Sequence, residues 1–118
     1  MALARSVVSL RMRADALKGH LDGLLLAVLA SGPAHGYAVI EAIRSGSGGT
    51  FDLPTGTVYP ALHRLEVAGL ITGSWSDGEG RRRRTYRLTA AGRRALVEHR
   101  SVWTQFSGAV SAIMATGT

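Results

Sequence analysis

Five arginines lie within seven consecutive positions of this 118-residue sequence, Arg81 to Arg84 and then Arg87. Neutralising the phosphates of a nucleic-acid backbone releases their counterions, and this is the main sequence-independent contribution to affinity. A run of this kind therefore indicates a phosphate-binding surface. The alternative is a solvated edge strand, whose arginines prevent other chains from pairing with it.

Side chains suited to catalysis or metal binding are scattered along the sequence. There is no cysteine, which excludes disulfides, thiolate zinc sites and thiol catalysis. The eight acidic residues contain no obvious pair, and no glycine-rich phosphate loop precedes a helix in a βαβ context. The histidines fall in separate expected elements without metal-site spacing: His20, His35, His63 and His99. We therefore expect no enzyme, no catalytic residue, no metal and no cofactor.

The overall composition is that of a basic globular protein. Fourteen lysines and arginines against eight acidic residues give a formal charge of +6 and a pI near 11.1, and 46% of the residues are hydrophobic. The longest apolar stretch, residues 24–30, is far shorter than the roughly 20 residues that cross a bilayer. No apolar signal-peptide core follows Arg5. We expect a cytoplasmic protein that does not bind a membrane.

Three helices are expected before the arginine run. Residues 21–30 are apolar almost all round, which is typical of a buried helix, and Ser31-Gly32-Pro33 ends it. A second helix is expected over about residues 35–44, followed by a flexible Gly/Ser loop over residues 45–49. The inner face of this second helix is expected to carry Tyr37, Ile40 and Ile43.

The third of these helices places Val58, Leu62 and Leu65 inward. Pro60 falls within the same pattern. An interior proline removes a helical hydrogen bond and clashes with the preceding turn. Physical chemistry alone therefore starts this helix nearer Tyr59.

A β-hairpin is expected after Gly69, where the hydrophobic period shortens. Residues 71–76 and 82–88 would form its strands, joined by the turn-rich Asp77-Gly78-Glu79-Gly80. Tyr86 and Leu88 would share one face of the second strand. The other face would carry Arg83, Thr85 and Arg87.

Two terminal helices are expected, one over residues 1–18 and a longer one from the N-cap Thr89 to about Ala115. Both carry apolar residues at alternating spacings of 3 and 4, and one small domain cannot easily cover both seams. We therefore expect a twofold-symmetric homodimer, with packing of the first helix on the last within one chain as the alternative. The expected interface comprises Leu3, Val7, Leu10, Leu96, His99, Trp103, Phe106, Val110 and Ile113.

Three helices followed by a two-stranded hairpin is the order of a winged helix-turn-helix, a mainly α fold with a small β-hairpin (α+β). The third helix would offer its N-terminal side chains to the major groove, and the arginine-rich hairpin would be the wing. Hydroxyls and cations on this helix can bond phosphates or base edges, although Tyr59 has the alternative of packing beneath the wing. The predicted DNA contacts are Lys18, His35, Thr55, Gly56, Thr57, Tyr59, His63, Arg64, Arg82, Arg83 and Arg84.

Several segments resemble the PadR-type transcriptional regulators. The most specific is Thr57-Val58-Tyr59-Pro60-Ala61-Leu62-His63-Arg64-Leu65-Glu66, with Ala68-Gly69-Leu70 after it. Residues 24–29 and 32–37 match the opening of the family pattern, and residues 80–84, 86–89 and Gly92 complete it. The resemblance covers roughly residues 17–96 in the right order. One departure is Thr85, where many relatives carry an aromatic residue.

The resemblance implies a dimeric, bacterial, repressor-like regulator with a winged-helix DNA reader and a C-terminal dimerisation helix. It also implies that Pro60 lies inside a recognition helix that starts near Pro54. Some such regulators stack flat aromatic ligands on tryptophans across the dimer interface. Trp103 and Phe106 are therefore the candidate effector residues, with plain interface core as the alternative.

We therefore predict dimer support over residues 1–18, a DNA-binding domain over residues 19–89 and a dimerisation helix over residues 90–118. The predicted function is that of a regulator, in the first place a repressor, that binds promoter duplex DNA as a homodimer and is released by a small molecule. The alternatives are a winged-helix adaptor for other proteins and a non-specific DNA-binding protein.

Overall fold

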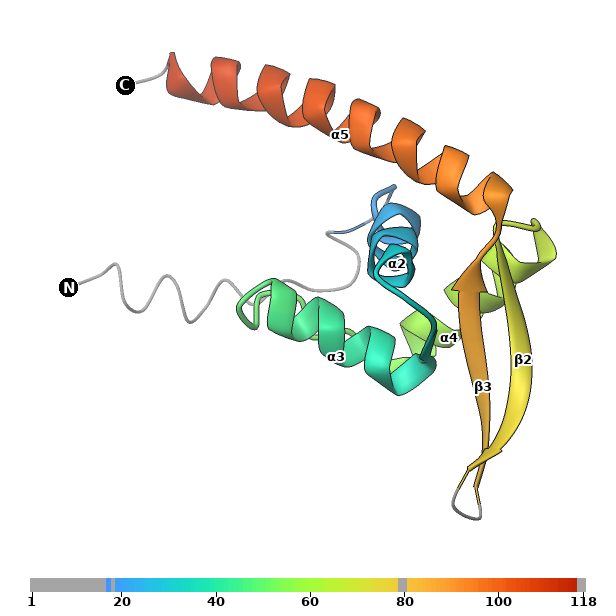
Figure 1. Ribbon diagram of the computed structural model, residues 1–118. Helices are drawn as coiled ribbons and strands as arrows, with labels where there is room; N and C mark the ends of the chain where they lie inside the picture. Colours follow the sequence, from blue (N-terminus) through green and yellow to red (C-terminus); the bar gives the residue numbers. More distant parts are fainter. Residues whose placement is uncertain (1–16, 18, 79–80, 117–118) are drawn as a thin grey trace.

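The computed structural model describes residues 17, 19–78 and 81–116 (Figure 1). Of the helix predicted over residues 1–18, only Leu17 is described, and Leu3, Val7, Leu10 and Lys18 lie outside the described residues. The described chain is α+β, as predicted. Its elements are α2 (Leu21–Ala30), β1 (Ala34–His35), α3 (Gly36–Gly46), α4 (Thr55–Val67), β2 (Ile71–Gly78), β3 (Arg81–Leu88) and α5 (Ala90–Ala115).

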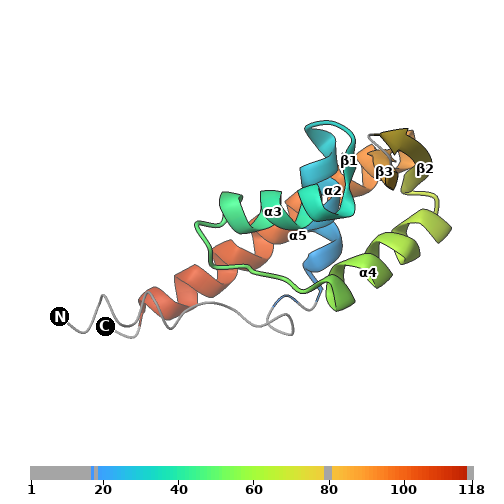
Figure 2. The ribbon, with the colours of Figure 1, turned by 90° about the horizontal axis from the view of Figure 1, so that it is seen from below.

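The described helices form layers around α2. In Figure 1, α5 runs along one side of α2, and α3 and α4 lie on the other. Figure 2 views this second side directly and shows the strands at one end of it. The hairpin of β2 and β3, which we call the wing, extends past α3 and α4 and away from α5 (Figure 1). One side of the molecule is therefore built from α3, α4 and the wing.

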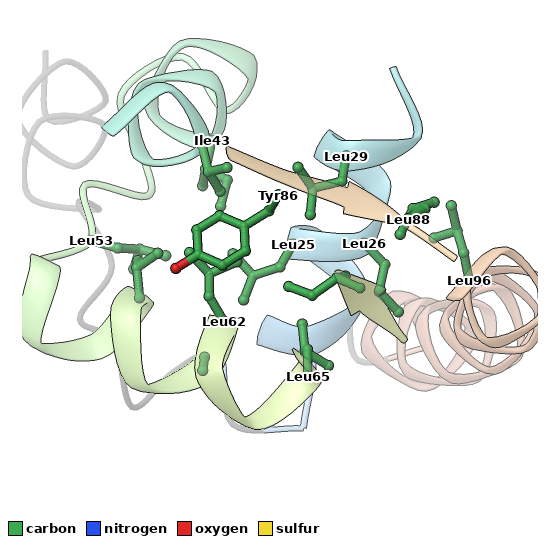
Figure 3. Packing of buried hydrophobic residues seen from close by; sticks show 14 of the residues in the cluster. Leu25, Leu26, Leu29, Ile43, Leu53, Leu62, Leu65, Tyr86, Leu88 and Leu96 are labelled. Atoms are coloured by element: carbon green, nitrogen blue, oxygen red, sulfur yellow. The ribbon is translucent and has the colours of Figure 1, made fainter. Parts of the chain in front are cut away.

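The core gathers around α2, whose apolar sequence predicted a buried helix. Leu25, Leu26 and Leu29 are almost completely buried (Figure 3). Full burial of a leucine stabilises a fold by about 1.5–3 kcal/mol, so these three side chains anchor the domain. The cluster around them includes Val39, Ile43, Leu53, Val58, Leu62, Leu65, Ile71, Tyr86, Leu88 and Leu96.

The helix α4 begins at Thr55, as the family resemblance implied, and the start near Tyr59 that physical chemistry alone predicted is wrong. Pro54 is its N-cap, and Pro60 lies inside it. A proline at this position lacks the N–H that would bond the carbonyl of Gly56, four residues earlier. Gly56 and Pro60 are both exposed, so water can hydrate that carbonyl. The proline is tolerated because it lies on the solvent-facing side of the helix.

A tight reversal joins α4 to the wing. The Leu70 N–H donates to the carbonyl of Leu65 and the Gly69 N–H to that of Glu66, both at 3.0 Å. Gly69 has a φ of +80°, a left-handed conformation that glycine adopts without strain. The last turn of α4 therefore lies next to the start of β2.

The sheet is antiparallel with the strand order β1-β3-β2. The hairpin strands are slightly longer than predicted, and Tyr86 and Leu88 share a buried face as expected. β1 was not predicted, because two residues carry no periodic signal. Its residue Ala34 pairs with Tyr86, and His35 pairs with Thr85. This short pairing fastens the beginning of α3 to the wing.

The beginning of α5 is fixed by Thr89, which is the predicted N-cap. Its Oγ1 accepts from the Gly92 N–H at 3.0 Å and donates to the Gly69 carbonyl at 2.7 Å. Gly92 is buried against the backbone of Leu70, and Leu96 one turn later is in the core. The beginning of the long C-terminal helix is thus anchored to the wing domain.

Candidate nucleic-acid interface

The helix α4 has one buried and one exposed face. Its inward side consists of Val58, Ala61, Leu62 and Leu65. The exposed side carries Gly56, Tyr59, Pro60, His63 and Val67, with Thr55 exposed at its start and Thr57 half-buried. A polar, solvent-facing side on a helix beside an arginine-rich hairpin is the geometry that the sequence predicted for DNA recognition.

Arg64 lies on the flank of α4 that faces α2. Its Nη2 is 2.6 Å from the Oδ1 of Asp22, in the first turn of α2. Its side chain remains 60% exposed, so this is a surface ion pair, which contributes at most about 1 kcal/mol to stability. The pair orients Arg64 toward α2 without burying its guanidinium.

Tyr59 packs against the first residue of α3. A Cβ at Gly36 would collide with the Tyr59 ring, so the close approach requires glycine at this position. Burial raises the pKa of the Tyr59 hydroxyl above its ordinary value, with a smaller contribution from Tyr37. At neutral pH the hydroxyl is therefore protonated and able to donate a hydrogen bond.

Tyr37 lies on the surface, and its predicted place in the core is wrong. Its side chain is 67% exposed and meets the Tyr59 ring edge-on at 6.5 Å. The inner stripe of α3 is Gly36, Val39 and Ile43, which follows the 3, 4 spacing of a helix more closely than the predicted set. Because Tyr59 covers Gly36, the space beside it is filled and Tyr37 remains outside.

His35 joins α3 to the wing through both of its ring nitrogens. As the N-cap of α3, it accepts the Ala38 N–H at Nδ1, at 3.3 Å. In the neutral ring this places the proton on Nε2, which lies 3.1 Å from the Nη1 of Arg83. Two donors then point into the same space. An acceptor such as a phosphate oxygen would satisfy both of them.

The arginines of the wing divide between its two faces. Trp75 is paired with Arg84, and Asp77 with Arg82, so these side chains share one face. Arg82 stacks over the Trp75 ring at 4.8 Å, lies 3.6 Å from the Asp77 carboxylate and is 67% exposed. Arg84 instead bonds to the carboxylate of Glu66 in α4, and both partners are partly buried. This one face therefore holds two kinds of arginine, an exposed one stacked on Trp75 and a less exposed one paired with α4.

Sequence reasoning missed Trp75, although the hairpin register contained a signal for it. With Gly78 paired to Arg81, Trp75 stands directly across from Arg84 and diagonally from Arg82. A tryptophan face attracts a guanidinium, so this cross-strand position favours a stack of both arginines on one ring.

A second predicted site lies on α5, far from α4. The His20 ring contacts Trp103 at 5.2 Å and Phe106 at 5.5 Å, and Trp103 and Phe106 are 6.1 Å apart. Both remain about half exposed. His99 packs against Gly23 of α2, whereas Leu96 is buried in the core of its own chain. The predicted aromatic pair therefore forms a surface cluster on α5.

Residues 17, 19–78 and 81–116 contain no group of three histidine, aspartate or glutamate side chains that could hold a metal ion. No described helix combines the length and apolarity required to span a membrane.

Three helices, a small antiparallel sheet and an arginine-rich hairpin define a winged-helix protein with a long C-terminal helix. Residues 25–98 match the Transcriptional regulator PadR-like family. The chain therefore belongs to the PadR-like family of transcriptional regulators. Members of this family regulate transcription, bind DNA and are not enzymes.

Known relatives and structures agree with this family. A protein of Lysinibacillus sphaericus called uncharacterized protein X is 27% identical over 104 residues, which cover 87% of this chain and 95% of that protein. Transcriptional regulator Rv3488 of Mycobacterium tuberculosis is 56% identical over 45 residues, 38% of this chain and 42% of that protein. The structure of a PadR family transcriptional regulator from Eggerthella lenta has a TM-score of 0.74 at 29% identity, covering 98% of this chain and 95% of that one.

Proposed function

We propose that this chain represses transcription by binding promoter duplex DNA, with α4 in the major groove and the wing along the backbone. The observation that carries the proposal is the convergence of Arg83 in β3 and His35 at the start of α3, whose Nη1 and Nε2 atoms lie 3.1 Å apart. A bound phosphate oxygen could accept a hydrogen bond from each of them. Phosphate contacts of this kind fix the register of a protein on the duplex.

The exposed side of α4 would supply base recognition. Gly56 allows the helix to approach the groove closely, and His63 can donate to a base acceptor. Arg64 reaches DNA in this proposal only by leaving Asp22. The remaining proposed contacts are Thr55, Thr57, Tyr59, Arg82 and, outside the described residues, Lys18.

We also propose that two chains pair through α5. Beyond its first two turns this helix exposes Trp103, Phe106, Val110 and Ile113 along one seam. A twofold axis through this seam would bury the apolar side of α5 in both chains. It would also set the two recognition helices about 34 Å apart, which is one turn of DNA. Residues 90–118 would then be the dimerisation element and residues 19–89 the DNA-binding domain.

A flat aromatic molecule is the proposed effector, stacked on Trp103 and Phe106 at this interface. It would release DNA by binding one spacing of the two domains better than the other. Quenching of Trp103 fluorescence in a Trp75→Phe variant tests this, and an unquenched signal with every flat aromatic probe argues for a plain interface core.

Titration of duplex DNA over a salt series tests the proposed function. A regulator binds one sequence far more tightly than random duplex of equal length, and its affinity falls with salt. A non-specific DNA-binding protein would bind both duplexes equally. An adaptor for other proteins would bind neither.

Arg83→Ala should weaken binding to every duplex to a similar extent. Removing one phosphate contact should reduce the slope of log affinity against log salt concentration by about 0.9. Anisotropy titrations at several salt concentrations measure this slope. Arg44→Ala is the matched control, because it removes the same charge from the last turn of α3, where Arg44 pairs with Glu41. An unchanged slope for Arg83→Ala would exclude the proposed contact.

A further inference from the structure

The wing is a projecting hairpin whose angle to α4 must be held by contacts at its base. The Glu66 Oε2 in the last turn of α4 accepts the Gly73 N–H of β2 at 3.3 Å and also bonds to the Nη2 of Arg84 in β3. One carboxylate oxygen thus joins α4 to both strands of the wing. We call Glu66, Gly73 and Arg84 the wing bracket.

Gly73 provides the space in which the Arg84 guanidinium lies. A Cβ at Gly73 would be 2.7 Å from the Arg84 Nε and 3.0 Å from its Cζ. The guanidinium therefore lies across the backbone of β2, with the Trp75 ring at 5.3 Å and the Tyr86 ring at 6.0 Å. Arg84 is packed, paired and stacked at the same time.

Burial separates Arg84 from the other described arginines of the wing. Arg84 and Glu66 are 28% and 25% exposed, the lowest values among the ion pairs of the described residues. Arg82 is 67% exposed on the same face, and Arg83 is exposed on the opposite face beside His35. Ion pairs with little exposure are screened weakly by salt, so this pair persists where surface pairs fade.

We propose that the wing bracket sets the angle between the wing and α4, and that Arg84 is a positioning residue that acts on DNA through this angle and not through contact with phosphate. The inference rests on the proposed DNA binding and assigns the backbone contacts of the wing to Arg82 and Arg83. Arg84 was predicted as a DNA contact from its place in the arginine run, and the bracket gives it a different role.

Glu66→Ala distinguishes the wing bracket from a purely electrostatic effect of Glu66, because the two predict changes of opposite sign in DNA affinity. Removing a carboxylate beside the DNA-binding face should strengthen binding if only charge matters. The bracket predicts binding weakened about five- to tenfold, since the wing phosphate contacts move out of register. Glu41→Ala, which removes the same charge from the exposed pair with Arg44, is the control and should not weaken binding. Equal or tighter binding by Glu66→Ala would overturn the proposal.

The salt dependence of Arg84→Ala gives a second test. If Arg84 acts only through the bracket, Arg84→Ala should change the slope of log affinity against log salt concentration to the same extent as Glu66→Ala, which removes no cation. A slope lower by about a further 0.9 for Arg84→Ala would show that Arg84 contacts a phosphate. The charge swap Glu66→Arg with Arg84→Glu should bind more tightly than either single variant, and failure of this rescue would also contradict the bracket.

A readout without DNA distinguishes failure of the bracket from failure of the proposed function. The chain has two tryptophans, so a nitrogen–proton correlation spectrum holds two indole signals, and Trp75→Phe assigns them. Glu66→Ala and Arg84→Ala should each shift the Trp75 signal and leave that of Trp103 in place. Loss of both signals would report unfolding of the variant, and the charge swap then carries the test. An unmoved Trp75 signal contradicts the bracket even if the protein binds DNA.

Discussion

Val110→Asp combined with Ile113→Asp is expected to separate the dimer and to weaken binding to a duplex with two half-sites by at least about 100-fold. Both side chains are exposed on the apolar seam of α5, at 38% and 72%. Burial of each side chain would stabilise the dimer by about 1.5–3 kcal/mol, and a twofold axis would bury each of them twice. An aspartate in the same place would also lose hydration without gaining a partner, which destabilises the dimer further. Sedimentation velocity measures the dimer, and a DNA titration measures the affinity.

Val97→Asp is the control for this pair. Val97 is also exposed, at 66%, but it lies on the opposite side of α5 from Val110 and Ile113. It should leave both the sedimentation coefficient and the affinity close to those of the unaltered protein. A double variant that still sediments as a dimer would show that the interface lies elsewhere. An unaltered protein that sediments as a monomer would contradict the proposed dimer.

Gly92→Ala is expected to lower the free energy of unfolding by about 2–3 kcal/mol, the cost of forcing an extra methyl group into a packed contact. The new Cβ would overlap the carbonyl oxygen of Leu70, a backbone atom in the turn between α4 and β2. Since the same turn carries the Gly69 carbonyl bonded to Thr89, the strain disturbs the junction of α5 with the wing domain. Denaturant unfolding followed by circular dichroism measures the change.

Gly108→Ala tests the same substitution where space is free. Gly108 lies in the same helix, and nothing approaches its Cβ position within 4 Å. Alanine favours a helix interior over glycine by about 1 kcal/mol, so this variant should be more stable than the unaltered protein. Equal effects of the two substitutions would contradict the close packing of Gly92 on Leu70.

Features that depend on local pattern could be predicted from the sequence. The alternation of Arg83, Thr85 and Arg87 against Tyr86 and Leu88 gave the two faces of β3, and the register agrees. The N-cap at Thr89 followed from residue type and position alone. Each of these depends on interactions within a few residues, where helical and strand periods restrict the choices.

Features that depend on distant pairs were not predictable in this way. Glu66 and Arg84 are 18 positions apart, and nothing in the arginine run distinguishes the one that turns toward α4. This pairing is set by the packing of α4 against the wing, which no local pattern encodes. Tyr37 differs, because the 3, 4 spacing of Gly36, Val39 and Ile43 is local, and only the filling of the space beside Gly36 by Tyr59 depends on another helix.

The most direct test of DNA recognition by α4 and the wing begins with selection of binding sites from random duplex. The selected duplex and a scrambled duplex of equal length are then titrated with the protein. At about 0.15 M salt the selected duplex should bind at least about 1,000-fold more tightly, the lower end of the range for specific regulators. His63→Ala should reduce this ratio, whereas Arg83→Ala should weaken both duplexes and preserve it. Equal affinity for the two duplexes at every salt concentration, or no binding to either, would contradict sequence-specific recognition.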